Sequence, residues 1–266
     1  MRFAVIASSR TGSSAFTESL NRRPDILCNG EIFHPQQVKV RWSKQELTLK
    51  VHKELLELRE RDPNAFLERI YATNYGRVHV GFKIFGKHNP AVLKKLVKDR
   101  GVKKIVQFRR NVLAKYSSMQ LAAATGEWGR TGPTTEKTGG TKEKVLFDPQ
   151  HFWAFCQEYL KFYRDILQEL EETNQGYHFI NYEEINNPEF FRAAVRFIGG
   201  DTTNIKLATT MVKQNSTHIL SRFSNPNDVR EFLKANGLLH WSHEGEVTFS
   251  PVMRETRQLA GNSAGP

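Results

Sequence analysis

Short apolar runs alternate with longer amphipathic segments along most of this chain. Five runs rich in β-branched and aromatic residues predict strands, and they cover residues 2–7, 26–29, 78–85, 103–109 and 177–181. Apolar positions at helical spacing, often after a proline, predict helices over residues 63–75, 90–100, 111–124, 149–172 and 188–198. Strands that alternate with helices predict an α/β fold, in which helices cover both faces of a central parallel sheet.

The first predicted strand breaks abruptly into a loop of small polar residues. The apolar run from Phe3 to Ala7 is followed by Ser-Ser-Arg-Thr-Gly-Ser-Ser at residues 8–14, and a helical pattern continues to Asn21. Such a turn directs backbone N–H groups, small hydroxyls and the positive end of a helix to one point, which suits phosphate or sulfate. Arg10 adds a guanidinium whose fork of donors fits tetrahedral oxyanions. An ordinary turn with Ser/Thr caps is the alternative interpretation.

This loop differs from the common nucleotide-binding loops. No second glycine followed by Lys and Ser/Thr stands at Walker A spacing, and no glycine triplet marks a dinucleotide-binding fold. A nucleotide kinase-like P-loop protein is therefore only a distant alternative.

A second cationic site is expected after the strand at residues 103–109. Arg110 stands at the end of that strand, and Ser118 follows about two helical turns later. Ligands of parallel sheets bind beyond the carboxyl ends of the strands, so Arg10 and Arg110 can converge there. Two separated cations predict a ligand that carries phosphate groups at both ends.

These motifs resemble those of the sulfotransferases that use 3'-phosphoadenosine 5'-phosphosulfate (PAPS). Arg-Thr-Gly-Ser-Ser at residues 10–14 matches that family's 5'-phosphosulfate loop, and Arg110 with Ser118 matches its 3'-phosphate site. Further short matches in the same order most resemble bacterial carbohydrate sulfotransferases of the nodulation-factor type. They lie at residues 3–7, 24–31, 80–84, 109–111, 181–185, 197–199 and 213–215.

The resemblance implies a P-loop-like fold and transfer of the sulfuryl group of PAPS to an acceptor hydroxyl, with release of 3',5'-ADP and no metal. The expected acceptor is a carbohydrate or glycolipid, and the alternative is a small alcohol, a lipid or another secondary metabolite. The residues expected to bind the donor are Arg10, Thr11, Gly12, Ser13 and Ser14 at the phosphosulfate, Arg110 and Ser118 at the 3'-phosphate, and Lys213 over the nucleotide.

Attack by a hydroxyl requires a general base within hydrogen-bond reach. Relatives that act on small molecules carry a His after a Lys-Thr pair, but the matching stretch here begins Lys83-Ile84. Relatives that act on carbohydrates carry an acid at the end of the second strand, which makes Glu31 the candidate base and His34 the next choice. A structural carboxylate, paired with Arg10 or capping a helix, is the alternative role of Glu31. Lys83 is expected either to contact the sulfate or to reach solvent from a strand end.

Length and composition indicate how many domains the chain forms and where it is located. With 266 residues we expect one domain over residues 1–256, a flexible loop or lid at 126–146 and a disordered tail at 257–266. No apolar run suits a membrane helix or a signal peptide, so a cytoplasmic location is expected. Cys28 and Cys156 stand in no metal-ligand spacing and are expected in the core. A homodimer is compatible with these features.

The net charge of +11 leaves the class of partner open, because nucleic acid, an acidic membrane surface and a polyanionic small ligand all attract a basic protein. The densest basic segment, residues 94–104, is equally well explained as a solvated helix end. The chain shows neither an aromatic RNA-binding motif nor a zinc-finger pattern, so no nucleic-acid partner is expected. A noncatalytic nucleic-acid binder remains an alternative that rests on charge alone.

Overall fold

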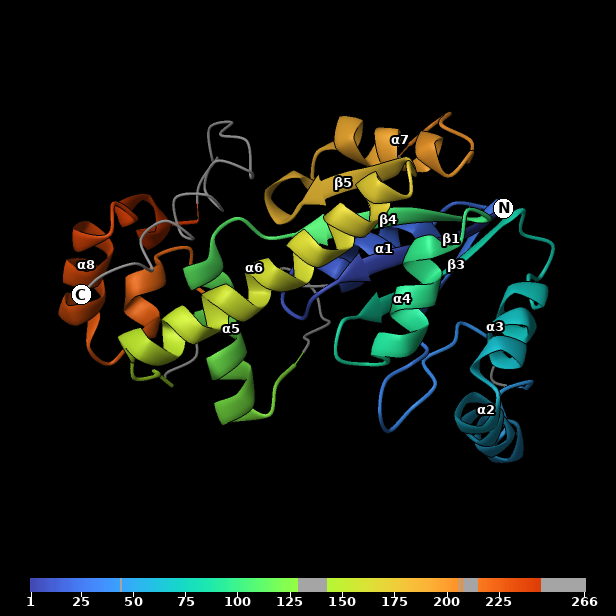
Figure 1. The fold of residues 1–266 in the computed structure, drawn as a ribbon, viewed down its shortest axis with the longest axis horizontal. Coiled ribbons are helices and arrows are strands. Elements are labelled where there is room, and N and C mark those ends of the chain that lie inside the picture. The colour runs from blue at the N-terminus through green and yellow to red at the C-terminus, as the bar shows by residue number, and fades with distance from the viewer. Residues whose placement is uncertain (44, 129–142, 206, 208–214, 245–266) are drawn as a thin grey trace. The chain divides into compact units, whose positions relative to one another are not determined.

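The computed structural model describes residues 1–43, 45–128, 143–205, 207 and 215–244. Its strands, drawn as arrows in Figure 1, are β1 (Arg2–Ala7), β2 (Ile26–Glu31), β3 (His79–Phe85), β4 (Val102–Phe108) and β5 (Tyr177–Asn181). They form one parallel sheet with the strand order β2-β3-β1-β4-β5. The predicted parallel sheet is confirmed, and the five strands begin and end within two residues of their predicted positions.

The described α-helices connect and follow these strands. They are α1 (Ser13–Asn21), α2 (Leu49–Arg61), α3 (Pro63–Ala72), α4 (Pro90–Lys98), α5 (Val112–Thr125), α6 (Pro149–Glu172), α7 (Pro188–Phe197) and α8 (Pro226–Ala235). Helices α2 and α8 were not predicted from the sequence. In α2 only Leu55 and Arg59 are buried, so its apolar face is too narrow to give a periodic signal.

Helices cover both faces of the sheet, as predicted. Phe3 and Val5 of β1 pack on the face covered by α1 and α7, where the rings of Phe16 and Phe191 meet at 5.9 Å. Successive side chains of a strand point to opposite faces. Phe82 of β3 accordingly packs on the other face, 5.8 Å from Tyr71 of α3.

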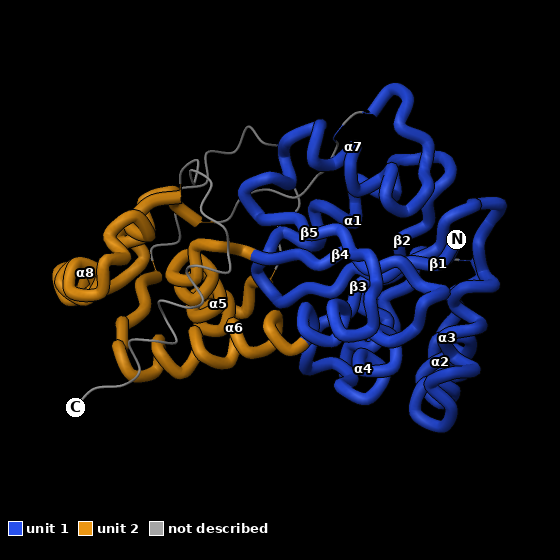
Figure 2. The backbone as a smooth tube through the Cα atoms, turned by 45° about the horizontal axis from the view of Figure 1, so that its top comes forward, with its two compact units in different colours: residues 1–108, 166–211 blue, residues 109–165, 212–266 orange. Residues whose placement is uncertain are grey.

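The chain divides into two compact units, each built from two segments (Figure 2). Unit 1 comprises residues 1–108 and 166–211 and contains the sheet, and unit 2 comprises residues 109–165 and 212–266. The prediction of one domain over residues 1–256 stays a prediction. Most of the expected loop at 126–146 and all of the expected tail at 257–266 lie outside the described residues. Val145, at the end of that loop, forms a β-bridge with Phe223 within unit 2.

Cys28 and Cys156 are both free and buried, which confirms them as core residues. None of the helices in the described ranges combines the length and the apolar character needed to cross a membrane.

Candidate functional site

The loop between β1 and α1 has the backbone geometry of an anion-binding turn. Arg10 has a φ of 63° and Gly12 a φ of 74°, whereas Thr11 between them is not in the positive-φ region. Alternation of this kind turns successive backbone N–H groups toward one side of the chain. Gly12 is the N-cap of α1, and no side chain caps that helix end. The positive terminus of α1 and the N–H groups of the loop can therefore serve a bound anion.

Neighbouring elements of unit 1 hold this loop in place. Thr11 is fully buried, its hydroxyl donates to the carbonyl of Ser8 at 2.8 Å, and its carbonyl accepts from Gln107 Nε2 at 2.8 Å. A Cβ on residue 12 would lie 2.6 Å from Ile185 Cδ1. Glycine is thus required at position 12 both by its φ and by the space around it.

Glu31, the last residue of β2, lies between two ammonium groups. Glu31 Oε1 is 2.9 Å from Lys83 Nζ, and Glu31 Oε2 is 2.9 Å from Lys39 Nζ. Lys83 Nζ also donates to Ser14 Oγ, in the first turn of α1, at 2.9 Å. The alternative in which Lys83 reaches solvent is wrong, because this residue is 3% exposed within β3, and its contact with the sulfate stays a prediction. A continuous chain of polar contacts therefore joins the anion loop, Lys83 and Glu31.

The two lysines determine the protonation of Glu31. Burial by itself would raise the pKa of Glu31, but the charges and hydrogen bonds of Lys83 and Lys39 outweigh burial and lower its pKa to about 2. Burial lowers the pKa of Lys83, and the Glu31 carboxylate opposes that effect. Glu31 is ionised at neutral pH, as a base must be, but a carboxylate held by two cations is a weak proton acceptor. Its cationic partners here are Lys83 and Lys39.

His34 and His88 lie beside this pair. Their ring centroids are 5.7 Å apart, and His88 also contacts the ring of Phe85 at 4.9 Å. Burial lowers the pKa of both, that of His88 to about 4. His34 Nδ1 accepts the backbone N–H of Gln36 at 3.2 Å, so neutral His34 carries its proton on Nε2. In that tautomer Nε2 already carries a proton, so His34 can accept another only if the contact between Nδ1 and the Gln36 N–H breaks.

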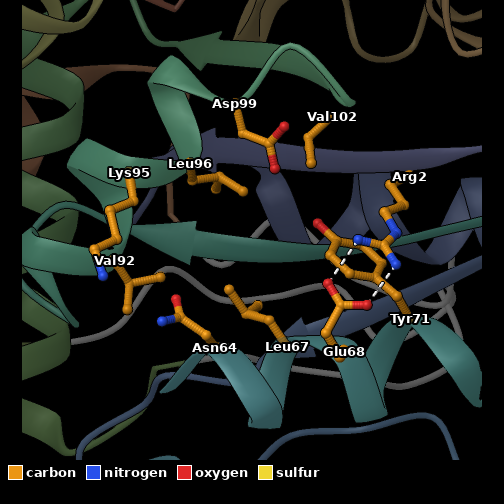
Figure 3. A pocket seen from close by; sticks show the side chains of 10 residues that line it. All are labelled: Arg2, Asn64, Leu67, Glu68, Tyr71, Val92, Lys95, Leu96, Asp99 and Val102. Atoms are coloured by element: carbon orange, nitrogen blue, oxygen red, sulfur yellow. Dashed lines mark hydrogen bonds and ion pairs between the residues drawn. The ribbon is translucent and has the colours of Figure 1, made fainter. Parts of the chain in front are cut away.

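A small pocket in unit 1 lies at the opposite edge of the sheet (Figure 3). It has a volume of about 110 Å³, and its lining includes the first residues of β1 and β4, Arg2 and Val102. Arg2 is paired with Glu68 of α3 at 2.6 Å and lies over the ring of Tyr71. This pocket is separate from the anion loop, because it lies at the amino ends of β1 and β4, whereas the loop follows the carboxyl end of β1.

The basic segment at residues 94–104 is largely engaged in contacts within unit 1. Lys98 pairs with Glu169 at 3.0 Å, Arg100 donates to the carbonyl of Thr173 at 2.7 Å, and Lys103 lies over the ring of Phe197. Lys104 is 1% exposed and donates to the carbonyl of Asp99 and to Gln175. These contacts explain much of the segment without a nucleic-acid partner.

In unit 2, Arg110 and Ser118 are both buried, at 5% and 2% exposure. Arg110 immediately precedes Asn111, which is the N-cap of α5 and accepts the Ala114 N–H at 2.8 Å. Ser118 lies on α5, where its hydroxyl accepts from Asn215 Nδ2 at 2.9 Å. Arg10 belongs to unit 1 and Arg110 to unit 2, so the convergence of the two cations stays a prediction. Lys213 lies outside the described residues.

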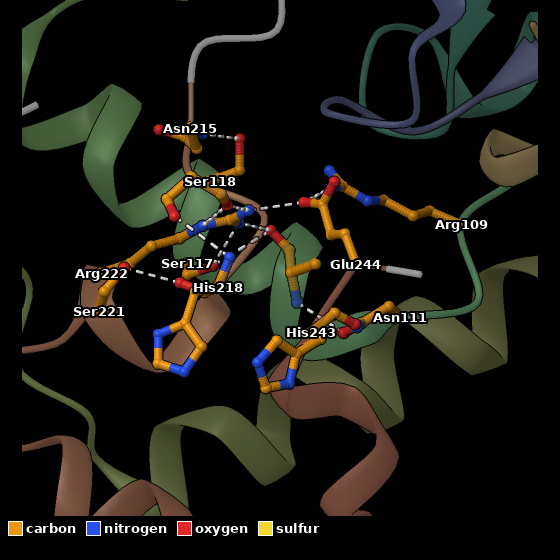
Figure 4. A network of polar contacts seen from close by, with 12 residues as sticks. Arg109, Asn111, Ser117, Ser118, Asn215, His218, Ser221, Arg222, His243 and Glu244 are labelled. Carbon is orange, nitrogen blue, oxygen red and sulfur yellow. Dashed lines mark hydrogen bonds and ion pairs between the residues drawn. The ribbon is translucent and has the colours of Figure 1, made fainter. Parts of the chain in front are cut away.

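Unit 2 contains a buried network of polar contacts that was not predicted from the sequence (Figure 4). Arg109 and Arg222 both bind Glu244 Oε1, at 2.5 Å and 2.6 Å. Arg222 also donates to the carbonyl of Ala114 at 3.1 Å and to Ser117 Oγ at 3.0 Å. Residues 109 and 244 are far apart in the sequence, and no local pattern links them. The network fixes the start of α5, next to Arg110, against the segment at residues 215–244.

The described ranges contain no group of three or more His, Cys, Asp and Glu side chains that could hold a metal ion. The strand–loop–helix turn, the flanking lysine and the carboxylate at the end of the next strand define an α/β protein with a candidate anion site beyond the carboxyl ends of its strands.

Comparison with known proteins gives partial matches, while no family model matches the chain. Nodulation protein H of Rhizobium meliloti strain 1021 is 32% identical over 129 residues, which cover 47% of this chain and 49% of that protein. Nodulation protein H of Rhizobium tropici is 29% identical over 134 residues, which cover 49% of this chain and 50% of that protein. The chain thus matches about half the length of these curated relatives. The resemblance to the nodulation type, predicted from the motifs, is confirmed.

Two solved structures align with most of this chain at low identity and low TM-score. A sulfotransferase from Alicyclobacillus acidocaldarius has a TM-score of 0.47 and 14% identity and covers 90% of this chain and 96% of its own. The sulfotransferase domain from the curacin biosynthetic pathway has a TM-score of 0.41 and 16% identity. The alignment covers 98% of this chain and 97% of that domain. Likeness at these scores is too weak to bear on function.

Proposed function

We propose that this chain is a sulfotransferase that moves the sulfuryl group of PAPS to a hydroxyl of an acceptor, with a carbohydrate or glycolipid as the favoured acceptor. The observation that carries the proposal is the chain of contacts from Ser14, in the first turn of α1 directly after the anion loop, through Lys83 to Glu31. It brings a candidate anion site, a buried cation and a candidate base together at one edge of the sheet. The sequence resemblance to Nodulation protein H supports the same class of enzyme.

In the proposed reaction the acceptor oxygen attacks sulfur, the bond between sulfur and the bridging phosphate oxygen breaks, and 3',5'-ADP leaves. Arg10 and the backbone N–H groups of residues 11–14 hold the phosphosulfate and neutralise charge on the leaving oxygen. Arg110 and Ser118 hold the 3'-phosphate. The protein mainly supplies positioning and charge stabilisation, as in phosphoryl transfer.

Glu31 is the proposed acceptor of the hydroxyl proton. The pKa of Glu31 is low because two ammonium groups hold its carboxylate. For Glu31 to accept a proton readily, one of these ammonium groups must move away from it. Lys83 is suited to this change, since its Nζ already contacts both Glu31 and the hydroxyl of Ser14. An anionic donor at the loop would draw Lys83 toward itself and free one oxygen of Glu31. His34 is the second candidate for the base.

The first test is thermal unfolding with 3',5'-ADP and, separately, with ATP. A ligand that binds only the native state raises the melting temperature. We expect a rise with 3',5'-ADP and none with ATP. A rise with ATP alone would favour the kinase-like alternative, and salt-sensitive binding of duplex DNA without any effect of 3',5'-ADP would favour the nucleic-acid binder.

The second test addresses the reaction. Transfer from labelled PAPS is measured against a panel of oligosaccharides, glycolipids and small alcohols, which also decides between the favoured acceptors and the alternative ones. Glu31→Gln should abolish most turnover and leave the affinity for 3',5'-ADP nearly intact. Turnover equal to that of the wild type would eliminate Glu31 as the base.

A further inference from the structure

The loop that follows Glu31 is folded around one buried guanidinium. Arg59 of α2 is 5% exposed. Its Nη1 donates to the carbonyls of Ile32 at 3.1 Å, His34 at 2.7 Å and Gln37 at 3.1 Å, and its Nη2 donates to the carbonyl of Pro35 at 3.4 Å. Four carbonyls of one loop thus point at a single cation. No other residue type offers five donors in a rigid planar fork.

The two ends of this loop are joined by backbone contacts. The N–H of Gly30 donates to the carbonyl of Lys39 at 2.8 Å, and the N–H of Arg41 donates to Asn29 Oδ1 at 2.9 Å. A Cβ on Gly30 would lie 3.0 Å from both the Cβ and the carbonyl oxygen of Lys39, so the two segments are closely packed. This closure sets Lys39 beside Glu31, where the Nζ to Oε2 distance is 2.9 Å.

Apolar packing supports the loop independently of Arg59. Phe33 is 2% exposed and its ring packs against Phe66 at 5.4 Å and Phe82 at 6.2 Å. Val38 is also 2% exposed. Loss of the guanidinium should therefore release the carbonyls of residues 32–37 while the loop keeps its apolar contacts with the core.

We propose that Arg59 and Lys39 are positioning residues for Glu31. Arg59 fixes the loop that carries Lys39, and Lys39 holds Glu31 Oε2 so that Oε1 faces Lys83 and the anion loop. That this arrangement serves catalysis rests on the proposed function, whereas the contacts that hold Glu31 are observed in the structure. The charged and titratable groups around Glu31 are Lys83 from β3, Lys39 from the loop, His34 from the same loop and His88 after β3.

The first experiment titrates the Glu31 carboxyl by carbon NMR in protein labelled at the glutamate side chains, with Glu31→Gln to assign the signal. Lys39→Met should raise the apparent pKa of Glu31 by about 1, because an opposite charge leaves the carboxylate. Arg59→Ala should raise it in the same direction, because the released loop lets Lys39 move away from Glu31. Millimolar guanidinium chloride should restore the wild-type pKa to Arg59→Ala, whereas sodium chloride at the same concentration should not. Arg61→Ala, on an exposed residue of the same helix, is the matched control.

The second experiment measures turnover with PAPS and the acceptor selected in the panel. Arg59→Ala should lower kcat by about 100-fold and regain activity with guanidinium, while its affinity for 3',5'-ADP stays at the wild-type value. Arg59→Lys keeps the charge and should show an intermediate kcat even if the alanine variant folds poorly. A Glu31 pKa that equals the control in Lys39→Met or Arg59→Ala would overturn the proposal. Absence of 3',5'-ADP binding by the wild type would instead refute the proposed function and leave the titration result valid.

Discussion

The ion pairs of Glu31 predict a stability difference that depends on pH. In Glu31→Gln the carboxylate is replaced by a neutral amide, and the buried ammonium of Lys83 loses its charged partner. A pKa lowered from 4.5 to about 2 corresponds to about 2–3 kcal/mol of net stabilisation, after allowance for screening of a carboxylate that is partly exposed. Glu31→Gln should therefore lower the free energy of unfolding at pH 7 by about 2–3 kcal/mol.

The sign of the pH dependence follows from the lowered pKa. A carboxylate with a depressed native pKa contributes its full stabilisation above the unfolded pKa, and this contribution is lost as the pH falls through the native pKa. The difference between wild type and Glu31→Gln should thus be constant above about pH 5. It should fall to less than half of its neutral value near pH 3.

Urea unfolding followed by circular dichroism, at several pH values between 7 and 3, measures this difference. The control is Glu57→Gln, which removes the exposed partner of Lys53 and should cost less than about 1 kcal/mol at every pH. A Glu31→Gln variant as stable as the wild type at pH 7, or equally destabilised at pH 7 and pH 3, would refute the electrostatic reasoning.

Three further predictions concern other parts of the chain. Gly12→Ala should abolish 3',5'-ADP binding and should destabilise unit 1 more than Gly76→Ala does. Gly76 has a similar φ of 75° but open space around it, so it is the control for crowding. Equal effects of the two substitutions in thermal unfolding would argue against crowding at residue 12. Glu244→Gln should lower the free energy of unfolding by about 3–5 kcal/mol, because two buried guanidiniums lose their shared carboxylate. Urea unfolding measures this loss, and a loss below about 1 kcal/mol would contradict the prediction. Cys28 and Cys156 should react with a thiol reagent only after denaturation, since both are buried, and rapid reaction of the native protein would show otherwise.

The strands and the anion loop were predictable because their signals are local. Continuous apolar runs identify buried parallel strands, and an abrupt change to small polar residues identifies the turn into α1. The position of Glu31 at the end of β2 was also predictable. Helix α2 was not, because its buried face consists of Leu55 and Arg59, and an arginine gives no apolar signal.

The partners of the site residues required the tertiary structure. Parallel pairing of β2 with β3 sets Glu31 beside Lys83, fifty-two positions later in the chain. The sequence motif marked Lys83 as a candidate site residue, but no sequence pattern showed that it pairs with Glu31. No sequence pattern showed the contacts of Arg59 either, whose four carbonyl acceptors become visible only when the loop is folded around it. The sequence by itself determined the five strands, the helices other than α2 and α8, and the place of the loop between β1 and α1, since these depend on local hydrophobicity and backbone chemistry. Only the tertiary structure decided which charges neutralise one another, because ion pairing depends on distances between segments that the chain brings together from far apart.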